Sequence, residues 1–143
     1  MKFLSHPTVV RLAGIAIGLV FVVAGLAKVG DPTAFAAQVH NFRMMPIPLE
    51  NLLAMTLPWV ELVAGVALIL GVRERGAAAL LLFLMALFTV AVGQAVARGL
   101  SFECGCFGKA DSSTVGLKKI GENIALTAVA WVATRRPLTP KGR

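Results

Sequence analysis

The chain has 143 residues, a length typical of one domain, and its composition is far from that of a soluble protein. Hydrophobic residues make up 57% of it and its mean hydropathy is +0.81, whereas soluble domains are about 45–50% apolar. The formal net charge of +7 does not indicate a nucleic-acid partner, because the basic residues lie at the ends of apolar runs and not along one face. We therefore expect an integral membrane protein that binds no nucleic acid.

Four apolar segments are expected to span the lipid bilayer. The third contains no charged residue between residues 76 and 97, and at about 1.5 Å per residue this run matches a hydrocarbon core of about 30 Å. The first is interpreted as a retained membrane helix and not as a cleaved signal. The sequence thus predicts one all-α membrane domain, a four-transmembrane-helix bundle with spans at about 9–28, 48–71, 76–97 and 117–135.

A short helix is predicted between the first two spans. Asp31 and Pro32 form an N-cap followed by a proline at the first helical position. Phe35, Val39 and Phe42 then recur at helical spacing, which favours an interfacial helix whose apolar side rests on the membrane.

The connections determine which ends of the spans meet. Residues 72–75 predict a tight hairpin between the second and third spans, whereas residues 98–116 form a long connection before the fourth. Four spans place both termini on one side, and the basic residues divide eight to six in favour of that side. By the positive-inside rule we expect a bacterial inner (cytoplasmic) membrane protein with cytoplasmic termini and the 98–116 loop in the periplasm. The eight are Lys2, Arg11, Arg73, Arg75, Arg135, Arg136, Lys141 and Arg143, and the six are Lys28, Arg43, Arg98, Lys109, Lys118 and Lys119.

Both cysteines of the protein lie in this loop, in the stretch Cys104-Gly105-Cys106-Phe107-Gly108. Gly105 removes side-chain bulk between the thiols, and Gly108 suits a tight turn. Two neighbouring thiols on an oxidising side of a membrane can exchange electrons through a mixed disulfide. Cys104 and Cys106 are therefore the candidate catalytic residues, with Gly105, Phe107 and Gly108 shaping the loop.

Two other interpretations of the cysteines stay open. They could be incidental buried thiols, which behave as small hydrophobes. They could also hold copper(I), which accepts two sulfur ligands, whereas a structural zinc site needs four ligands and the chain adds only His6 and His40. Met44 and Met45, close to His40, are either further soft ligands or packing residues.

Glu61 lies near the middle of the second span, where an unpaired carboxylate is costly, so it should face the bundle and find a partner. Arg11 is the expected partner because of its longer side chain, and Lys28 is the alternative. Such a pair could carry protons for quinone or dithiol chemistry, or only join the first two spans. Trp59 and Gln94 complete the predicted polar or quinone site.

Small residues at regular spacing predict where helices approach closely. Gly14 and Gly18 form a GxxxG step with Gly25 one heptad further, and a second stripe runs through Ala79, Ala86 and Gly93 in the third span.

These residues together resemble the DoxX/MauE group of small redox-associated four-helix membrane proteins. The likeness runs through Ala24-Gly25-Leu26-Ala27-Lys28, Asp31-Pro32 with Phe35, the Met-Met-Pro turn, Pro58-Trp59-Val60-Glu61-Leu62 and Cys104-Gly105-Cys106-Phe107-Gly108. The resemblance implies a membrane protein that supports periplasmic thiol–disulfide chemistry during maturation of a disulfide-rich enzyme subunit. DoxX-like relatives imply contact with quinone.

The sequence hypothesis is electron transfer between Cys104/Cys106 and a periplasmic thiol or thioredoxin-like protein, with quinone as a second carrier. One alternative is a non-catalytic accessory subunit of a larger membrane redox complex. Another is a copper(I)-handling membrane protein.

Overall fold

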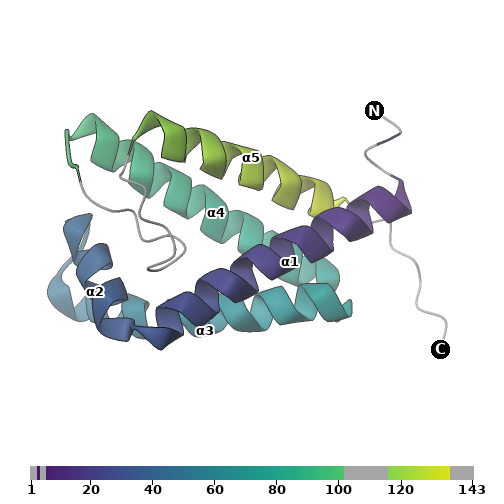
Figure 1. The fold of residues 1–143 in the computed structure, drawn as a ribbon, viewed down its shortest axis with the longest axis horizontal. Helices are drawn as coiled ribbons and strands as arrows, with labels where there is room; N and C mark the ends of the chain where they lie inside the picture. Colours follow the sequence, from purple (N-terminus) through teal and green to yellow (C-terminus); the bar gives the residue numbers. More distant parts are fainter. Residues whose placement is uncertain (1–2, 4–5, 102–115, 136–143) are drawn as a thin grey trace.

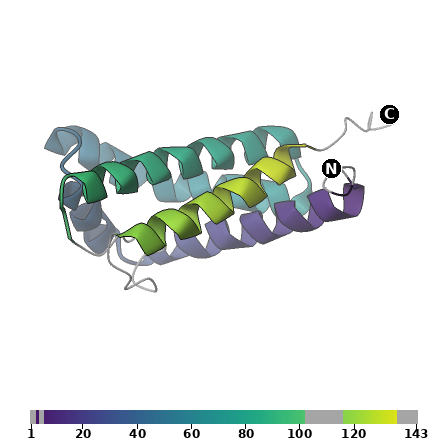
Figure 2. The same ribbon diagram turned by 90° about the horizontal axis from the view of Figure 1, so that it is seen from above.

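The computed structural model describes residues 3, 6–101 and 116–135, and this part of the chain forms five α-helices. Four long helices lie side by side, and one short helix lies at one end of the bundle (Figures 1 and 2). The all-helical prediction is confirmed, and no end of a predicted span differs from its helix by more than two residues. The helices are α1 (Pro7–Gly30), α2 (Pro32–Asn41), α3 (Ile47–Leu70), α4 (Glu74–Ala97) and α5 (Leu117–Thr134).

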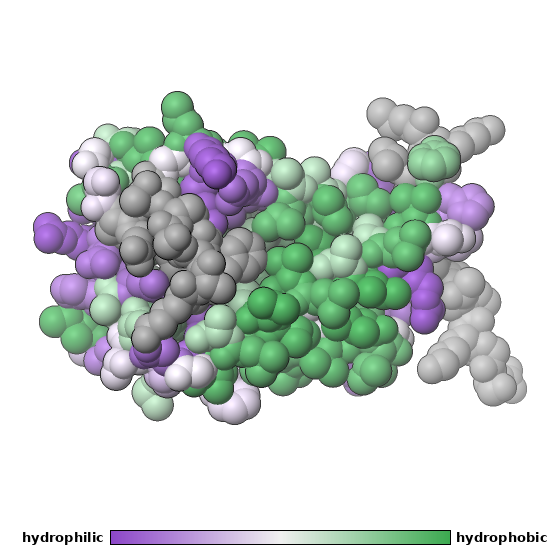
Figure 3. All heavy atoms as spheres, in the orientation of Figure 1, coloured by the Kyte–Doolittle hydropathy of each residue, from purple (hydrophilic) through white to green (hydrophobic). Residues whose placement is uncertain are grey.

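Helices α1, α3 and α4 are long and apolar enough to cross a membrane, with 24 residues each. Figure 3 shows apolar side chains covering the middle of the visible face, with polar ones gathered toward its ends. Helix α5 has only 18 residues, and its first two turns contain Lys118, Lys119 and Glu122. It is therefore shorter and more polar than the other three long helices. The membrane assignment is therefore supported by three helices, and the four-span count is not confirmed.

Helices α1 and α3 cross closely because glycines leave room for their backbones. A Cβ atom on Gly18 would lie 2.8 Å from the carbonyl oxygen of Gly65, and one on Gly25 would lie 2.9 Å from that of Pro58. The higher residue of α1 thus meets the lower residue of α3, so the two helices are antiparallel. Gly14, Gly18 and Gly25 are all buried, and this predicted stripe is confirmed.

The second predicted stripe is wrong. Ala79 and Ala86 are exposed on α4, and a Cβ atom on Gly93 would meet nothing within 4 Å. The adjacent face of α4 packs inward instead, with Ala78, Leu81 and Met85 in the buried core.

The connection between α3 and α4 is the predicted tight hairpin. Gly71 ends α3 in the left-handed conformation with φ 77°, and the Val72 N–H donates to the Ala67 carbonyl at 2.9 Å. Arg73 also has a positive φ, of 46°. The hairpin lies at the same end of the bundle as the start of α1 and the end of α5, opposite α2 (Figure 1).

Helix α2 begins at the predicted N-cap, but its apolar side faces the bundle. The Asp31 carboxylate accepts the Ala34 N–H at 3.0 Å, which confirms the N-cap. Phe35 is buried in the core with residues of α3 and α4, and Val39 packs against the same cluster. The apolar side of α2 thus closes the end of the bundle and does not lie on lipid, because that end offers apolar surface of α3 and α4 to bury.

The close contact of α1 and α3 predicts a sharp difference between two glycines. Gly65→Val should force the α1 and α3 backbones apart and lower the free energy of unfolding by about 1–3 kcal/mol. Gly93→Val is the matched control, since its side chain would enter open space. Thermal unfolding of the purified protein in detergent measures both, and equal losses would contradict the packing described here.

Candidate functional site

The predicted redox stretch Cys104-Gly105-Cys106-Phe107-Gly108 lies outside the described residues. The chain leaves α4 at Ala97 and enters α5 at Leu117, and both points lie at the end of the bundle that carries α2 (Figure 1). The cysteine-containing connection therefore begins and ends opposite the start of α1.

Lys28 and Glu61 form a buried ion pair between α1 and α3. The Lys28 Nζ atom donates to both Glu61 carboxylate oxygens at 2.8 Å, and each residue is only 1% exposed. Two charges without water gain from such contact only if their geometry and hydrogen bonds are good. The bidentate contact meets that condition and joins the two helices across 33 residues of sequence.

The expected pairing of Glu61 with Arg11 is wrong. Arg11 is exposed, and the antiparallel register that sets Gly18 against Gly65 places it near the far end of α3. Side chains on a helix tilt toward its N-terminus, so in antiparallel helices Lys28 and Glu61 tilt toward each other. Lys28 reaches the carboxylate for this reason, although its own Cα lies at the end of α1.

Trp59 and Gln94 do not join the predicted polar site. Trp59 is 59% exposed on α3, and Gln94 is exposed on α4. Each occupies a helix position about 100° or more away from the buried face of its helix, a separation that depth in the span alone does not reveal. Of the five residues predicted for this site, the structure brings together Lys28 and Glu61.

Two aromatic rings enclose the Lys28 ammonium group, and the sequence reasoning missed their role. The Nζ atom lies 5.0 Å from the centre of the Phe35 ring and 5.1 Å from that of Phe88. Both distances allow cation–π attraction, which is stronger where water is excluded. Phe35 comes from α2 and Phe88 from α4, so four helices meet at one ion pair.

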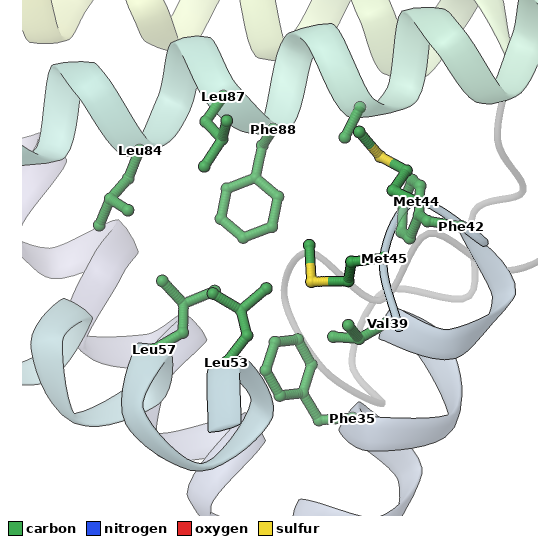
Figure 4. A pocket seen from close by; sticks show the side chains of 11 residues that line it. Phe35, Val39, Phe42, Met44, Met45, Leu53, Leu57, Leu84, Leu87 and Phe88 are labelled. Carbon is green, nitrogen blue, oxygen red and sulfur yellow. The ribbon is translucent and has the colours of Figure 1, made fainter. Parts of the chain in front are cut away.

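An apolar cavity of about 130 Å³ lies beside these rings (Figure 4). Phe88 and Leu87 point from α4 toward Leu53 and Leu57 of α3, and Met45 points in from the segment after α2. Every side chain that the described residues place around it is apolar, which suits hydrocarbon better than a charged ligand. Its lining consists of Phe35, Val39, Phe42, Met44, Met45, Leu53, Leu57, Leu84, Leu87, Phe88 and Ala91.

Met44, Met45 and His40, the candidate soft metal ligands, have other contacts in the structure. Both methionines line the apolar cavity, and the His40 Nδ1 atom lies 2.7 Å from a carboxylate oxygen of the buried Glu50. Within residues 3, 6–101 and 116–135, no three His, Cys, Asp or Glu side chains gather as a metal site would need. Among the described residues the methionines are packing residues of the cavity wall, and their relation to Cys104 and Cys106 lies outside the described part of the chain.

Helix α5 buries polar side chains near its start. Lys119 is 2% exposed and lies 3.3 Å from the Glu122 carboxylate, while Asn123 is fully buried. Lys119 of this polar turn is buried against protein, whereas Lys118 is exposed. The amide atoms of Asn123 have no hydrogen-bond partner in the described part of the chain.

The ion pair predicts strong coupling between two substitutions. Lys28→Met or Glu61→Leu alone leaves an unpaired buried charge and should lower the free energy of unfolding by about 3–5 kcal/mol. The double variant removes both charges and should be more stable than either single variant. Denaturant unfolding in detergent gives the three values, with the exposed Arg11→Met as control at about 0.5 kcal/mol or less. If the double variant loses as much free energy of unfolding as the two single variants together, the two residues are not coupled.

Comparison with known proteins gives a consistent result along nearly the whole chain. Residues 6–135 match the family profile described as Methylamine utilisation protein MauE. The methylamine utilization protein MauE of Methylorubrum extorquens is 34% identical over 142 residues, which cover 98% of this chain and 76% of the relative. That of Paracoccus denitrificans is 33% identical over 137 residues, covering 94% and 74%. That of Methylophilus methylotrophus is 29% identical over 143 residues, covering 99% and 75%.

No solved structure matches the chain. The matches support the MauE part of the DoxX/MauE resemblance, and the DoxX part stays a prediction. Since the family profile covers residues 6–135 and two of these relatives exceed 30% identity, the chain belongs to the MauE family.

Proposed function

We propose that this protein is an accessory membrane protein that exchanges electrons with a periplasmic partner through Cys104 and Cys106. The observation that carries the proposal is that both ends of the cysteine-containing connection lie opposite the start of α1 (Figure 1). In this proposal the connection stays on the side of the membrane where it begins and ends, so its thiols meet reactants from that side only. The relatives are named for methylamine utilization, and we extend that role to this chain.

The proposed topology has four spans within one membrane domain. Helix α5 packs along α4 and α1, and 18 residues at about 1.5 Å each approach the thickness of a hydrocarbon core. Lys119 is buried against protein, so its charge is not exposed to lipid. With four spans, the termini are cytoplasmic and the cysteine pair faces the periplasm of a bacterial inner membrane.

The proposed reaction is thiol–disulfide exchange. A thiolate of one protein attacks the disulfide of the other, and a mixed disulfide forms as one thiolate leaves. The second thiol of the attacking pair then resolves this bond, so one pair gains the two electrons and two protons that the other loses. The direction follows the reduction potentials of the two pairs.

Within this proposal, Lys28 and Glu61 have a structural role. Their charges satisfy each other at 2.8 Å and hold α1 against α3. A quinone near Glu61 has little support, because Arg11, Trp59 and Gln94 face outward and the neighbouring cavity is apolar. In this proposal the bundle gives the cysteine-containing connection a rigid support.

A topology experiment tests the four-span proposal. Reporters active only in the periplasm or only in the cytoplasm are fused after Arg135 and after Gly71. We expect the cytoplasmic reporter to be active at both positions, because the α3–α4 hairpin and the end of α5 lie at the same end of the bundle. Periplasmic activity after Arg135 alone would mean that α5 does not cross the membrane.

Trapping of mixed disulfides tests the proposed chemistry. In cells, Cys104→Ser or Cys106→Ser should stop the resolving step in one of the two variants and accumulate a covalent complex with a periplasmic protein that reductant releases. The double variant is the control and should trap nothing. Mass spectrometry of the complex identifies the partner.

Other outcomes of the trapping experiment would contradict redox exchange. A disulfide that resists mild reductant, together with normal partner oxidation in Cys104→Ser, would favour a non-catalytic accessory subunit. Thiol-dependent copper(I) binding without any mixed disulfide would favour copper handling.

A further inference from the structure

We propose that the α2 end of the bundle binds an anionic phospholipid, with part of one acyl chain in the apolar cavity and the phosphate beside Arg43 and Arg98. This inference goes beyond the redox proposal and depends only on the membrane location. A hydrocarbon space lies next to two arginines that form no salt bridge with any described residue, and an amphiphile with a negative head requires such an arrangement.

The cavity favours an acyl chain over other lipophilic ligands. Eleven side chains of the described residues line its space of about 130 Å³, and all of them are apolar (Figure 4). A quinone ring would bury two carbonyl oxygens there without hydrogen-bond donors, at a cost of about 1–3 kcal/mol for each. An alkyl chain has no polar atoms to satisfy and gains from leaving water.

The cavity opens toward the outside of the bundle. Leu87 on α4 is 48% exposed and Met44 after α2 is 42% exposed, although both line the cavity. The opening therefore lies between α4 and the segment that follows α2. In a bilayer, a chain can enter from the side without passing through water.

Two arginines lie at the edge of this opening. The Arg98 Nη1 atom donates to the carbonyl oxygens of Phe42 at 3.2 Å and Arg43 at 3.4 Å, so its guanidinium group is next to a residue that lines the cavity. Arg98 follows Ala91 by seven residues, about two turns along α4. Both arginine side chains are exposed, and in the described part of the chain neither forms a salt bridge.

The position of Arg98 along the helix fits a lipid head. It is the C-cap of α4, one of the three helices that can cross a membrane. The ends of spanning helices lie at the depth of the phosphates, where arginine attracts anionic lipids. Arg98 has five N–H donors, and a phosphate can accept those that the two carbonyls leave unused.

Native mass spectrometry of the full chain in neutral detergent tests the head-group part. We expect phosphatidylglycerol to be bound about 25-fold more tightly than phosphatidylcholine of the same chains, because each arginine near the surface contributes about fivefold. Arg98→Gln and Arg43→Gln should each lower the preference to about fivefold. Arg11→Gln removes the same charge near the start of α1, at the opposite end of the bundle, and should leave the lipid preference unchanged.

The Arg43 variant keeps the test decisive if Arg98→Gln disturbs the fold. Arg43 accepts the Arg98 hydrogen bond through its backbone carbonyl, so replacing its side chain leaves that contact in place. No preference in the native chain, or equal losses in Arg11→Gln and Arg43→Gln, would overturn the proposal.

A pair of tryptophan substitutions tests the acyl-chain part. Ala91→Trp fills the cavity from α4 and should weaken binding of both lipids at least about tenfold. Ala86→Trp is the matched control, because Ala86 is exposed on the same helix and does not line the cavity. Unchanged lipid binding in Ala91→Trp would overturn the proposal, as would solvent extraction that recovers a quinone in place of phospholipid.

Discussion

The buried pair of Lys28 and Glu61 is the contact on which the arrangement of this bundle depends. It joins α1 to α3 at 2.8 Å, while Phe35 of α2 and Phe88 of α4 enclose the ammonium group. An unpaired buried charge would be costly, so helix arrangements that keep Lys28 and Glu61 in contact are favoured over those that separate them. Glycines at the crossing of α1 and α3 allow the approach that brings the two charges together.

The same contact organises the end of the bundle that carries α2. Phe35 and Phe88 contact Lys28 and also form part of the cavity wall, so the ion pair and the cavity share these two rings. Arg98 fixes the turn after α2 to the end of α4 through two carbonyl oxygens. The cysteine-containing connection leaves α4 and enters α5 at this same end of the bundle.

Much of the fold could be predicted from the sequence, and much of the site could not. Helix ends were predicted to within two residues, because apolar runs, prolines and Gly71 act locally. Arg11 was wrongly preferred over Lys28 because depth in a span says nothing of helix register. The prediction that another helix approaches α4 closely along Ala79, Ala86 and Gly93 was wrong for a similar reason. Spacing alone does not tell which face of a helix packs inward.

The sequence by itself determined that this is a helical membrane protein with a carboxylate near the middle of one span and two neighbouring thiols, because composition and spacing are properties of the chain. Only the tertiary structure decided that Lys28 pairs with Glu61, that Trp59 and Gln94 face outward, and that α2 closes an apolar cavity. These outcomes depend on how helices cross and rotate about their axes. Crossing and rotation follow from contacts between residues far apart in the chain, and local patterns do not encode them.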